Sequence, residues 1–279
     1  MPAVYYSNAH IPLIAWMLIL ATSAWTGIDI APELMFVACS GAFIVYQIDH
    51  SWQVTQADHV NQPARVGWVL EHQVYVWLSI GIAAVIAVTA AWQNTYLVSV
   101  SVAVLAAIGL AYSGLRGIKR WLRVPFTKPL LIVMVWVYGT VVWPVTVPSE
   151  YGYQPYELAL LLLLGAVRAC WIGVNVWLAE GVDQVGDAVD GIVVIPERLR
   201  GDKQLLHVSG GLAMLGVGGI AGLGLATEQW TPMVWELTGW AILLTSLIYA
   251  YRKNQLATPA QRWLRDVLVA WPGGVALWI

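Results

Sequence analysis

Charged residues are scarce in this 279-residue chain: only 11% of its positions are Asp, Glu, Lys or Arg, whereas 59% are hydrophobic. A soluble domain carries about 25% charged residues. A chain with so few polar side chains cannot cover its apolar residues in water, so lipid is the expected medium. Cysteine is also rare. Cys39 and Cys170 lie within apolar runs, where we expect buried small side chains, not a disulfide or a metal site.

Other features that would indicate a function are missing. The sequence has no extended basic arm, which disfavours nucleic acid as a partner. It has no Ser/His/Asp arrangement, no phosphate-binding glycine loop and no cysteine nucleophile. The spacing of His50, His59 and His72 matches no common zinc pattern. The glycine-rich segment from Gly210 to Gly224 lies in an apolar run, where it predicts close packing between helices.

What the sequence does have is a series of long apolar runs, each close to the roughly 20 residues that span a membrane as a helix. We place nine of them, at Ile11–Ile28, Pro32–Ile48, Val74–Trp92, Thr95–Tyr112, Pro129–Val147, Leu158–Ala179, Leu205–Ala226, Pro232–Tyr251 and Leu264–Ile279. The segment before the first run has no basic residue and no small-residue cleavage site, which favours a retained helix over a cleaved signal peptide. The sequence thus predicts an all-α polytopic membrane protein. About nine transmembrane helices would surround a central cavity, in a single domain over residues 1–279.

The basic residues support this topology. Of the 14 Lys and Arg, 13 follow an even-numbered run, with Arg265 counted although it is the second residue of the ninth run, and Arg168 lies inside the sixth run. Such a bias places the even loops in the cytoplasm. Acidic loops follow runs two and six, and basic loops follow runs four and eight; Asp49 and Asp183 are 134 residues apart, and Arg116 and Arg252 are 136 apart. Coincidence is one explanation, and two four-helix halves, about 11–128 and 129–266, are the other. A duplication would place a site where the halves meet.

The clearest chemical signal is the acidic segment Glu180-Gly-Val-Asp183-Gln-Val-Gly-Asp187, directly after the sixth run. If the helix continues, residues spaced by three and seven positions share one face, so the three carboxylates point together. Like charges at a membrane edge are stable when a divalent cation lies among them, and Mg²⁺ is held by one or two carboxylates plus a substrate phosphate. A solvated acidic loop is the alternative.

A second polar segment follows run two, with Asp49-His50 and then Asp58-x-x-Asn61-x-Pro63-x-Arg65. Together with the acidic segment and Pro196-x-Arg198-Leu199, it resembles the UbiA superfamily of intramembrane prenyltransferases. That family has N-D-x-x-D-x-x-x-D-x-x-N-x-P-x-R-P after its second helix and D-x-x-D-x-x-x-D-x-x-x-G-x-x-T-x-P-x-R-L-G after its sixth. Val54 stands where the family has its middle aspartate, and Asp49 is expected to substitute for the leading one through a small insertion.

The resemblance implies an enzyme that moves a prenyl group from a prenyl diphosphate to a lipophilic, aromatic acceptor with the help of Mg²⁺. It implies catalytic roles for Asp58, Asp183 and Asp187, and metal ligands among Asp49, Asp58, Glu180, Asp183 and Asp187. The expected substrate-binding residues are Asn61, Arg65, Tyr112, Arg116, Lys119, Arg120, Arg168 and Asn175. For most of the basic segment from Arg116 to Lys128, anchoring at the membrane surface is the stronger alternative.

The sequence leaves one alternative function open, which is a UbiA-like subunit without catalysis that binds pigment or lipid within a membrane complex. A transporter is disfavoured, because the acids cluster at one interface and not in mid-helix.

Arg168 is the one basic residue near the middle of a predicted span. A charge near the bilayer centre costs about 2.5–3.5 kcal/mol, so its side chain needs a polar partner. It contacts either the diphosphate or acceptor, or forms a buried ion pair with Glu157 or Glu236.

Overall fold

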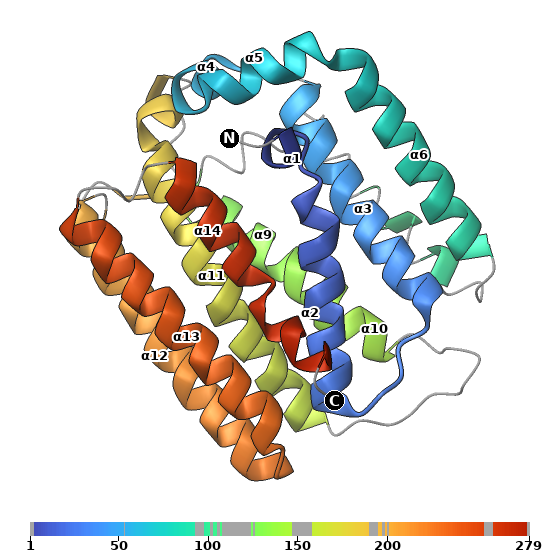
Figure 1. Ribbon diagram of the computed structural model, residues 1–279, viewed down its shortest axis with the longest axis vertical. Helices are drawn as coiled ribbons and strands as arrows, with labels where there is room; N and C mark the ends of the chain where they lie inside the picture. The colour runs from blue at the N-terminus through green and yellow to red at the C-terminus, as the bar shows by residue number, and fades with distance from the viewer. Residues whose placement is uncertain are drawn as a thin grey trace.

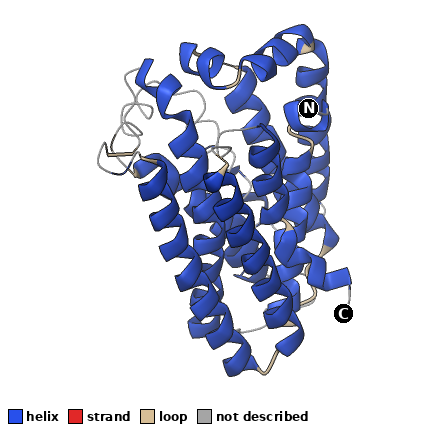
Figure 2. Cartoon of the chain, turned by 60° about the vertical axis from the view of Figure 1, so that its left-hand side comes forward, coloured by secondary structure: helices blue, strands red, loops and turns tan. Residues whose placement is uncertain are grey.

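The computed structural model describes residues 3–52, 54–92, 98–100, 103–104, 107, 124, 126–146, 158–189, 195–196, 199, 201–253 and 259–277. Within these residues the regular structure is all helical (Figure 2). The elements are α1 (Ala3–Tyr6), α2 (His10–Thr26), α3 (Pro32–Ser51), α4 (Gln56–Asn61), α5 (Pro63–Glu71), α6 (Gln73–Trp92), α9 (Thr127–Val137), the π-helical turn η1 (Tyr138–Val142), α10 (Trp143–Thr146), α11 (Leu158–Val189), α12 (Asp202–Thr227), α13 (Trp230–Arg252), α14 (Pro259–Val269) and the 3-10 helix η3 (Trp271–Leu277).

The first eight predicted runs correspond to helices in the residues that the structure describes. Five helical segments are long and apolar enough to cross a membrane: α6, the stretch Thr127–Thr146, α11, α12 and α13. The shorter apolar helix α2 and the 20-residue α3 coincide with the first two runs. The fourth run, Thr95–Tyr112, lies largely outside the described residues, so the number nine stays a prediction.

The prediction of one helix over the last run is wrong. The chain instead forms α14 and then η3, with Pro272 in the first turn of η3. Proline lacks the N–H that a continuing α-helix needs and clashes with the preceding turn. The short helix η3 packs against α2, where Gly273 lies so close to the backbone of Met17 that a Cβ atom would not fit.

Helix α11 is the central element of the bundle. It packs against α12, α9 and α4, while α12 packs in turn against α13. On the other side, α2 contacts α3, and α3 contacts α6. Figure 1 shows α4 and α5 lying across one end of the bundle, connecting α3 to α6. This crosspiece brings the segment after the second run next to the end of the sixth.

Tryptophan and glycine pack the interior of the helical pair α12–α13 and its contact with α11. Trp171 and Trp240 meet edge to face with ring centroids 4.4 Å apart, and both are about 1% exposed. A Cβ atom on Gly216 would collide with the ring of Trp240, and one on Gly219 would press on Val167. The predicted role in close helix packing is therefore confirmed for part of the segment, at Gly216, Gly219 and Gly224, whereas Gly210, Gly211, Gly218 and Gly222 have open space around them.

The outer surface of the bundle is apolar, as a lipid-facing surface should be. Val74, Leu162 and Met214 are 78%, 64% and 68% exposed, and they lie on three of the membrane-length helices. Contiguous exposed apolar side chains of this kind mark a surface that is covered in the native setting. Hydrocarbon is the covering that five membrane-length helices imply.

The length of α11 places its acidic end at the membrane boundary. Its 32 residues extend about 48 Å at 1.5 Å per residue. Because the hydrocarbon core is about 30 Å thick, the helix extends well beyond it. Helix α11 continues ten residues past Ala179, so Glu180, Asp183 and Asp187 are helical residues at the end where α4 and α5 lie.

Candidate functional site

The three carboxylates of α11 lie on one face of the helix, as their spacing predicts. Glu180 and Asp187 are 5% and 9% exposed, and the carboxylate of Asp183 is 20% exposed. Charges from Asp58, Glu180 and Asp183 act on Asp187, so the four acids lie within electrostatic range of one another. This end of α11 therefore concentrates negative charge in a largely buried setting.

Two cations from other helices balance part of that charge. Lys128 Nζ, at the start of α9, lies 2.8 Å from Glu180 Oε1. Arg262 Nη1, on α14, lies 2.8 Å from Asp183 Oδ1. The second oxygen of Glu180 and Oδ2 of Asp187 are buried and have no hydrogen-bond partner in the described part of the chain. Buried oxygens without partners are rare in proteins and indicate a missing proton, water or ion.

Helix α4 docks on the acidic end of α11 through one side chain. Asn61 Nδ2 donates to the carbonyl oxygen of Asp183 at 2.9 Å, and the backbone N–H of Gly186 donates to Asn61 Oδ1 at 3.0 Å. Gly186 makes this approach possible, because a Cβ atom there would lie 2.5 Å from the amide group of Asn61. The two predicted motifs thus meet directly, and Asn61 joins them as a structural contact.

Asp58 forms a helix cap with one of its two carboxylate oxygens. Its Oδ2 accepts hydrogen bonds from Thr55 N at 2.8 Å and Thr55 Oγ1 at 3.0 Å, and Asp58 N donates to Thr55 Oγ1 at 3.3 Å. This is a capping box, in which two side chains satisfy the free N–H groups at a helix start. The carboxylate is committed to starting α4, close to the acidic end of α11 but facing its own cap.

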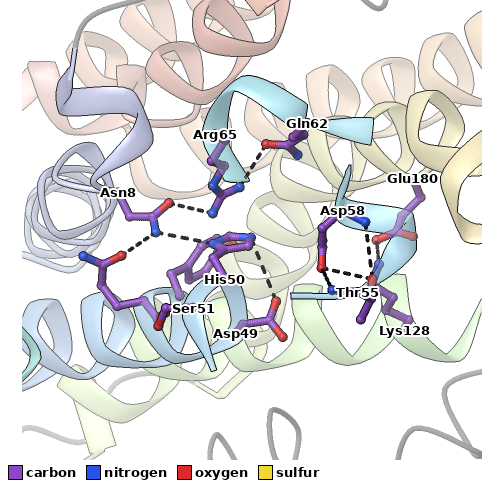
Figure 3. A network of polar contacts seen from close by, with 12 residues as sticks. Asn8, Asp49, His50, Ser51, Thr55, Asp58, Gln62, Arg65, Lys128 and Glu180 are labelled. Atoms are coloured by element: carbon purple, nitrogen blue, oxygen red, sulfur yellow. Dashed lines mark hydrogen bonds and ion pairs between the residues drawn. The ribbon is translucent and has the colours of Figure 1, made fainter. Parts of the chain in front are cut away.

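Arg65 is the centre of a second polar network (Figure 3). It is 8% exposed, and it donates from Nη1 to Gln62 Oε1 at 3.0 Å and from Nη2 to Asn8 Oδ1 at 3.2 Å. Asn8 in turn donates to Gln47 Oε1 at 2.8 Å and lies 3.4 Å from Nδ1 of His50. Burial lowers the pKa of Arg65 to about 10, which leaves it fully charged at neutral pH.

Arg65 lies within electrostatic range of the acidic segment of α11. Tyr5, Asp49, Asp266 and Asp183 all act on it. Its Nε is buried and has no hydrogen-bond partner within the described ranges. Asp49, which we expected among the metal ligands, lies 4.0 Å from Nε2 of His50 and also acts on Glu180. The polar groups of α3, α5 and α11 therefore share one electrostatic neighbourhood.

The last helix contributes residues that the sequence analysis passed over. Asp266 Oδ1 accepts a hydrogen bond from Asn175 Nδ2 at 3.1 Å, and Asp266 Oδ2 lies 3.6 Å from Nε2 of His10. The ring of His10 stacks on Tyr5 with centroids 5.4 Å apart. Sequence reasoning also missed Lys128 and Arg262 as partners of the acids. For Arg262 a signal was available, because Arg265 and Asp266 follow it at three- and four-residue spacing and so share its face of α14.

Arg168 forms the ion pair that was one of its two expected roles. Its Nη1 and Nη2 donate to the two carboxylate oxygens of Glu236 at 2.7 and 2.6 Å, and Trp25 Nε1 donates to Glu236 Oε1 at 2.6 Å. Arg168 and Glu236 are both fully buried. Arg168 thus has a structural partner, and Asn175 contacts Asp266. The roles expected of both residues in substrate binding stay predictions. Tyr112, Arg116, Lys119 and Arg120 lie outside the described residues.

The expected metal site is not assembled as a ready-made cage. Across the residues that the structure describes, no group of three His, Cys, Asp or Glu side chains is placed to hold a metal ion. The reason is visible in the pairings: Glu180 faces Lys128, Asp183 faces Arg262, and Asp58 caps α4. Hard oxygen donors suited to Mg²⁺ are nevertheless present on α11, in the free oxygens of Glu180 and Asp187.

Comparison with known proteins places this arrangement in a fold. No protein-family model matches the sequence, and a comparison with curated proteins finds no match. The structure, however, is similar to the apo structure of a UbiA homolog from Aeropyrum pernix K1, with a TM-score of 0.59 and 13% sequence identity over 95% of this chain and 94% of that one. The chain has the UbiA fold.

The UbiA fold agrees with the resemblance that the two motifs carry. The match extends over nearly the whole of both chains, so it covers both polar segments and the helices between them. At 13% identity it establishes the architecture, a helical membrane bundle, and leaves the chemistry to the residues of this chain. The all-α membrane fold predicted from the sequence is thereby confirmed.

Proposed function

We propose that this protein is a divergent intramembrane prenyltransferase of the UbiA type, which transfers a prenyl group from a prenyl diphosphate to a lipophilic, aromatic acceptor. The observation that carries the proposal is the meeting of α4 with the acidic end of α11 through Asn61, beside the buried Arg65. Cationic and anionic groups there lie at the edge of an apolar bundle. A ligand with a charged head and a hydrocarbon tail matches both environments.

Mg²⁺ is the cofactor that this chemistry implies, and the residues of α11 fit it. Glu180, Asp183 and Asp187 would hold the ion, since two of their buried oxygens have no partner in the described part of the chain. The motif after the second helix fits less well, because the carboxylate of Asp58 is taken up by its cap. When bound, Mg²⁺ would neutralise charge on the leaving diphosphate.

The protein's own residues supply the remaining parts of the reaction. The guanidinium of Arg65 is fixed by Gln62 and Asn8, and its Nε, which has no partner among the described residues, would donate to a diphosphate oxygen. Lys128 and Arg262 add two positive charges beside the acids and limit their mutual repulsion. The hydrocarbon around the bundle would hold the prenyl tail and keep water away from the allylic carbon while its bond to oxygen breaks.

Release of pyrophosphate tests this function. Wild-type protein in lipid vesicles, supplied with Mg²⁺, a prenyl diphosphate and an aromatic acceptor, should release pyrophosphate. Asp187→Asn should lower the rate by about 10²–10³, the usual loss when one charge-stabilising group is removed. Because Asp187 Oδ2 bonds nothing described, Asn should fit without loss of folding. Asp202→Asn, at an exposed position on α12, is the matched control.

The proposal is abandoned if correctly folded wild-type protein neither binds nor turns over any prenyl diphosphate. A second candidate is a non-catalytic UbiA-like subunit that binds pigment or lipid in a membrane complex. The pairing of Glu180 and Asp183 with built-in cations favours it, since these carboxylates are balanced without a metal. Binding of a prenyl lipid that neither needs Mg²⁺ nor leads to pyrophosphate release would support this second function.

A further inference from the structure

Arg265, on α14, is a buried arginine with unsatisfied hydrogen-bond donors. The residue is only 2% exposed, and its Nε and Nη1 have no hydrogen-bond partner in the described part of the chain. Arginine cannot escape this situation by losing its proton, because its charge persists at all physiological pH values. A buried cation with free donors is unfavourable unless an anion or ordered water completes it.

The nearby carboxylates are already committed to other groups. Asp266 and Asp183 are the acids that act on Arg265. Asp266 is held by Asn175 and lies next to His10, and Asp183 is paired with Arg262. Among the residues that the structure describes, Arg265 therefore shares these negative charges and has no carboxylate paired with it alone. This contrasts with Arg168, whose buried guanidinium has a bidentate partner in Glu236.

The position of Arg265 relates it to the acidic end of α11. Arg262 and Arg265 are three residues apart on α14, so they lie on one side of that helix. Arg262 reaches Asp183 at 2.8 Å. Tyr5, Asp183 and Asp266 act on both Arg265 and Arg65, which approach this region from α14 and α5. Two buried guanidiniums, each with donors that lack a partner in the described part of the chain, thus lie within electrostatic range of the same three groups.

We propose that Arg265 is an anion-binding residue that donates from Nε and Nη1 to a phosphate oxygen of the diphosphate, opposite Arg65. This inference rests on the proposed function, since it deepens the description of the same site. The paired Nε and Nη donors of a guanidinium match the spacing of two oxygens on a phosphate group. The negative charge of the bound ligand would act as the counter-ion of Arg265.

The proposal predicts opposite effects of one substitution on stability and on binding. Replacing an unpaired buried charge with an apolar side chain of similar length is neutral or stabilising for a protein. Arg265→Met should therefore keep or raise the melting temperature of the ligand-free protein. The same substitution should weaken the binding of inorganic pyrophosphate at least tenfold, whereas Arg265→Lys, which retains the charge, should recover part of the loss. Arg252→Met, at an exposed position at the end of α13, should change neither quantity.

The experiment uses full-length protein in detergent, with pyrophosphate binding measured by calorimetry and melting by tryptophan fluorescence. If Arg265→Met lowers the melting temperature and binds pyrophosphate like wild type, Arg265 is structural and the inference is overturned. If Arg265→Met does not fold, Arg265→Lys decides, because loss of the planar fork should weaken binding several-fold relative to Arg252→Lys. Unaltered binding in Arg265→Lys then overturns the inference.

The outcome is separable from that of the proposed function. Pyrophosphate binding that depends on Arg265, in a protein that releases none from prenyl diphosphates, supports the anion site and contradicts the transferase. Turnover that is equal in wild type and Arg265→Met does the reverse. Binding of sulfate as tight as that of pyrophosphate would contradict a site shaped for a diphosphate.

Discussion

The ion pair between Arg168 and Glu236 gives the sharpest test of how the bundle is held together. Both side chains are fully buried, and the carboxylate accepts two hydrogen bonds from Arg168 and one from Trp25. Glu236→Leu would leave the guanidinium charged and without a counter-ion. Breaking a buried pair from one side costs about 3–5 kcal/mol. The indole N–H of Trp25 also loses its bond to Glu236, so we expect a loss toward the top of this range.

The assay is unfolding in mixed micelles of a non-ionic detergent and sodium dodecyl sulfate, followed by far-ultraviolet circular dichroism. Glu71→Leu, at an exposed position at the end of α5, should stay within about 0.5 kcal/mol of wild type. The double variant Arg168→Met/Glu236→Leu removes both charges and should be more stable than Glu236→Leu alone. A loss below about 1 kcal/mol in Glu236→Leu, or a double variant less stable than the single one, would refute the reasoning.

The same variants separate a structural from a substrate-binding role for Arg168. Arg168 and Glu180 are 12 residues apart on α11, which is about 18 Å along the axis at 1.5 Å per residue. A diphosphate held at the acidic end lies beyond the reach of Arg168. The double variant should therefore bind pyrophosphate as tightly as wild type, and a marked loss of affinity would return Arg168 to the site.

Two further predictions concern packing near and away from the site. Asn61→Ala should release α4 from α11, with faster hydrogen exchange over residues 56–61 and a loss of about 1–3 kcal/mol, because two backbone partners lose their bonds; unchanged exchange there would contradict the docking role. Gly216→Ala should destabilise the fold by about 1–3 kcal/mol through overpacking. Gly218→Ala, which has open space around it, should be neutral, and equal effects of the two would contradict the packing.

The helical membrane fold could be predicted because each spanning helix makes its backbone hydrogen bonds within itself. Its length and apolar composition are therefore enough to identify it in the sequence. Boundaries were harder. Hydrophobicity falls after Ala179 and predicts the end of the sixth run there, yet α11 continues to Val189, because charged and small residues also form helix once it is nucleated. The last run was extended through Pro272, where hydrophobicity hides a break from α14 into η3.

The partners within the site could be predicted only in part. The helical spacing of Glu180, Asp183 and Asp187 places them on one face without knowledge of any other helix. Which cations face them depends on how α9 and α14 are rotated and packed, and hydropathy does not record this. The partner of Arg168 had the same uncertainty, since Glu157 and Glu236 were equal candidates until the packing of α11 near α13 separated them.

The local role of Asp58 shows that one side chain can fit two sequence signals. Its position in Asp58-x-x-Asn61-x-Pro63-x-Arg65 suggests a ligand, but Thr55 three residues before it also forms a capping box. A capping signal and a ligand signal can use the same carboxylate, and sequence alone does not rank them. Asn61 and Arg65 are more informative, because their contacts join α4 and α5 to other parts of the chain.

An experimental structure with a non-cleavable prenyl diphosphate analogue and Mn²⁺ tests the central claim most directly, since Mn²⁺ can be located by its anomalous scattering. The account predicts a diphosphate between the α4–α5 segment and the acidic end of α11, in contact with Arg65, with the metal beside Asp183 and Asp187. A diphosphate bound elsewhere on the protein, or no analogue bound at saturating concentration, would contradict it.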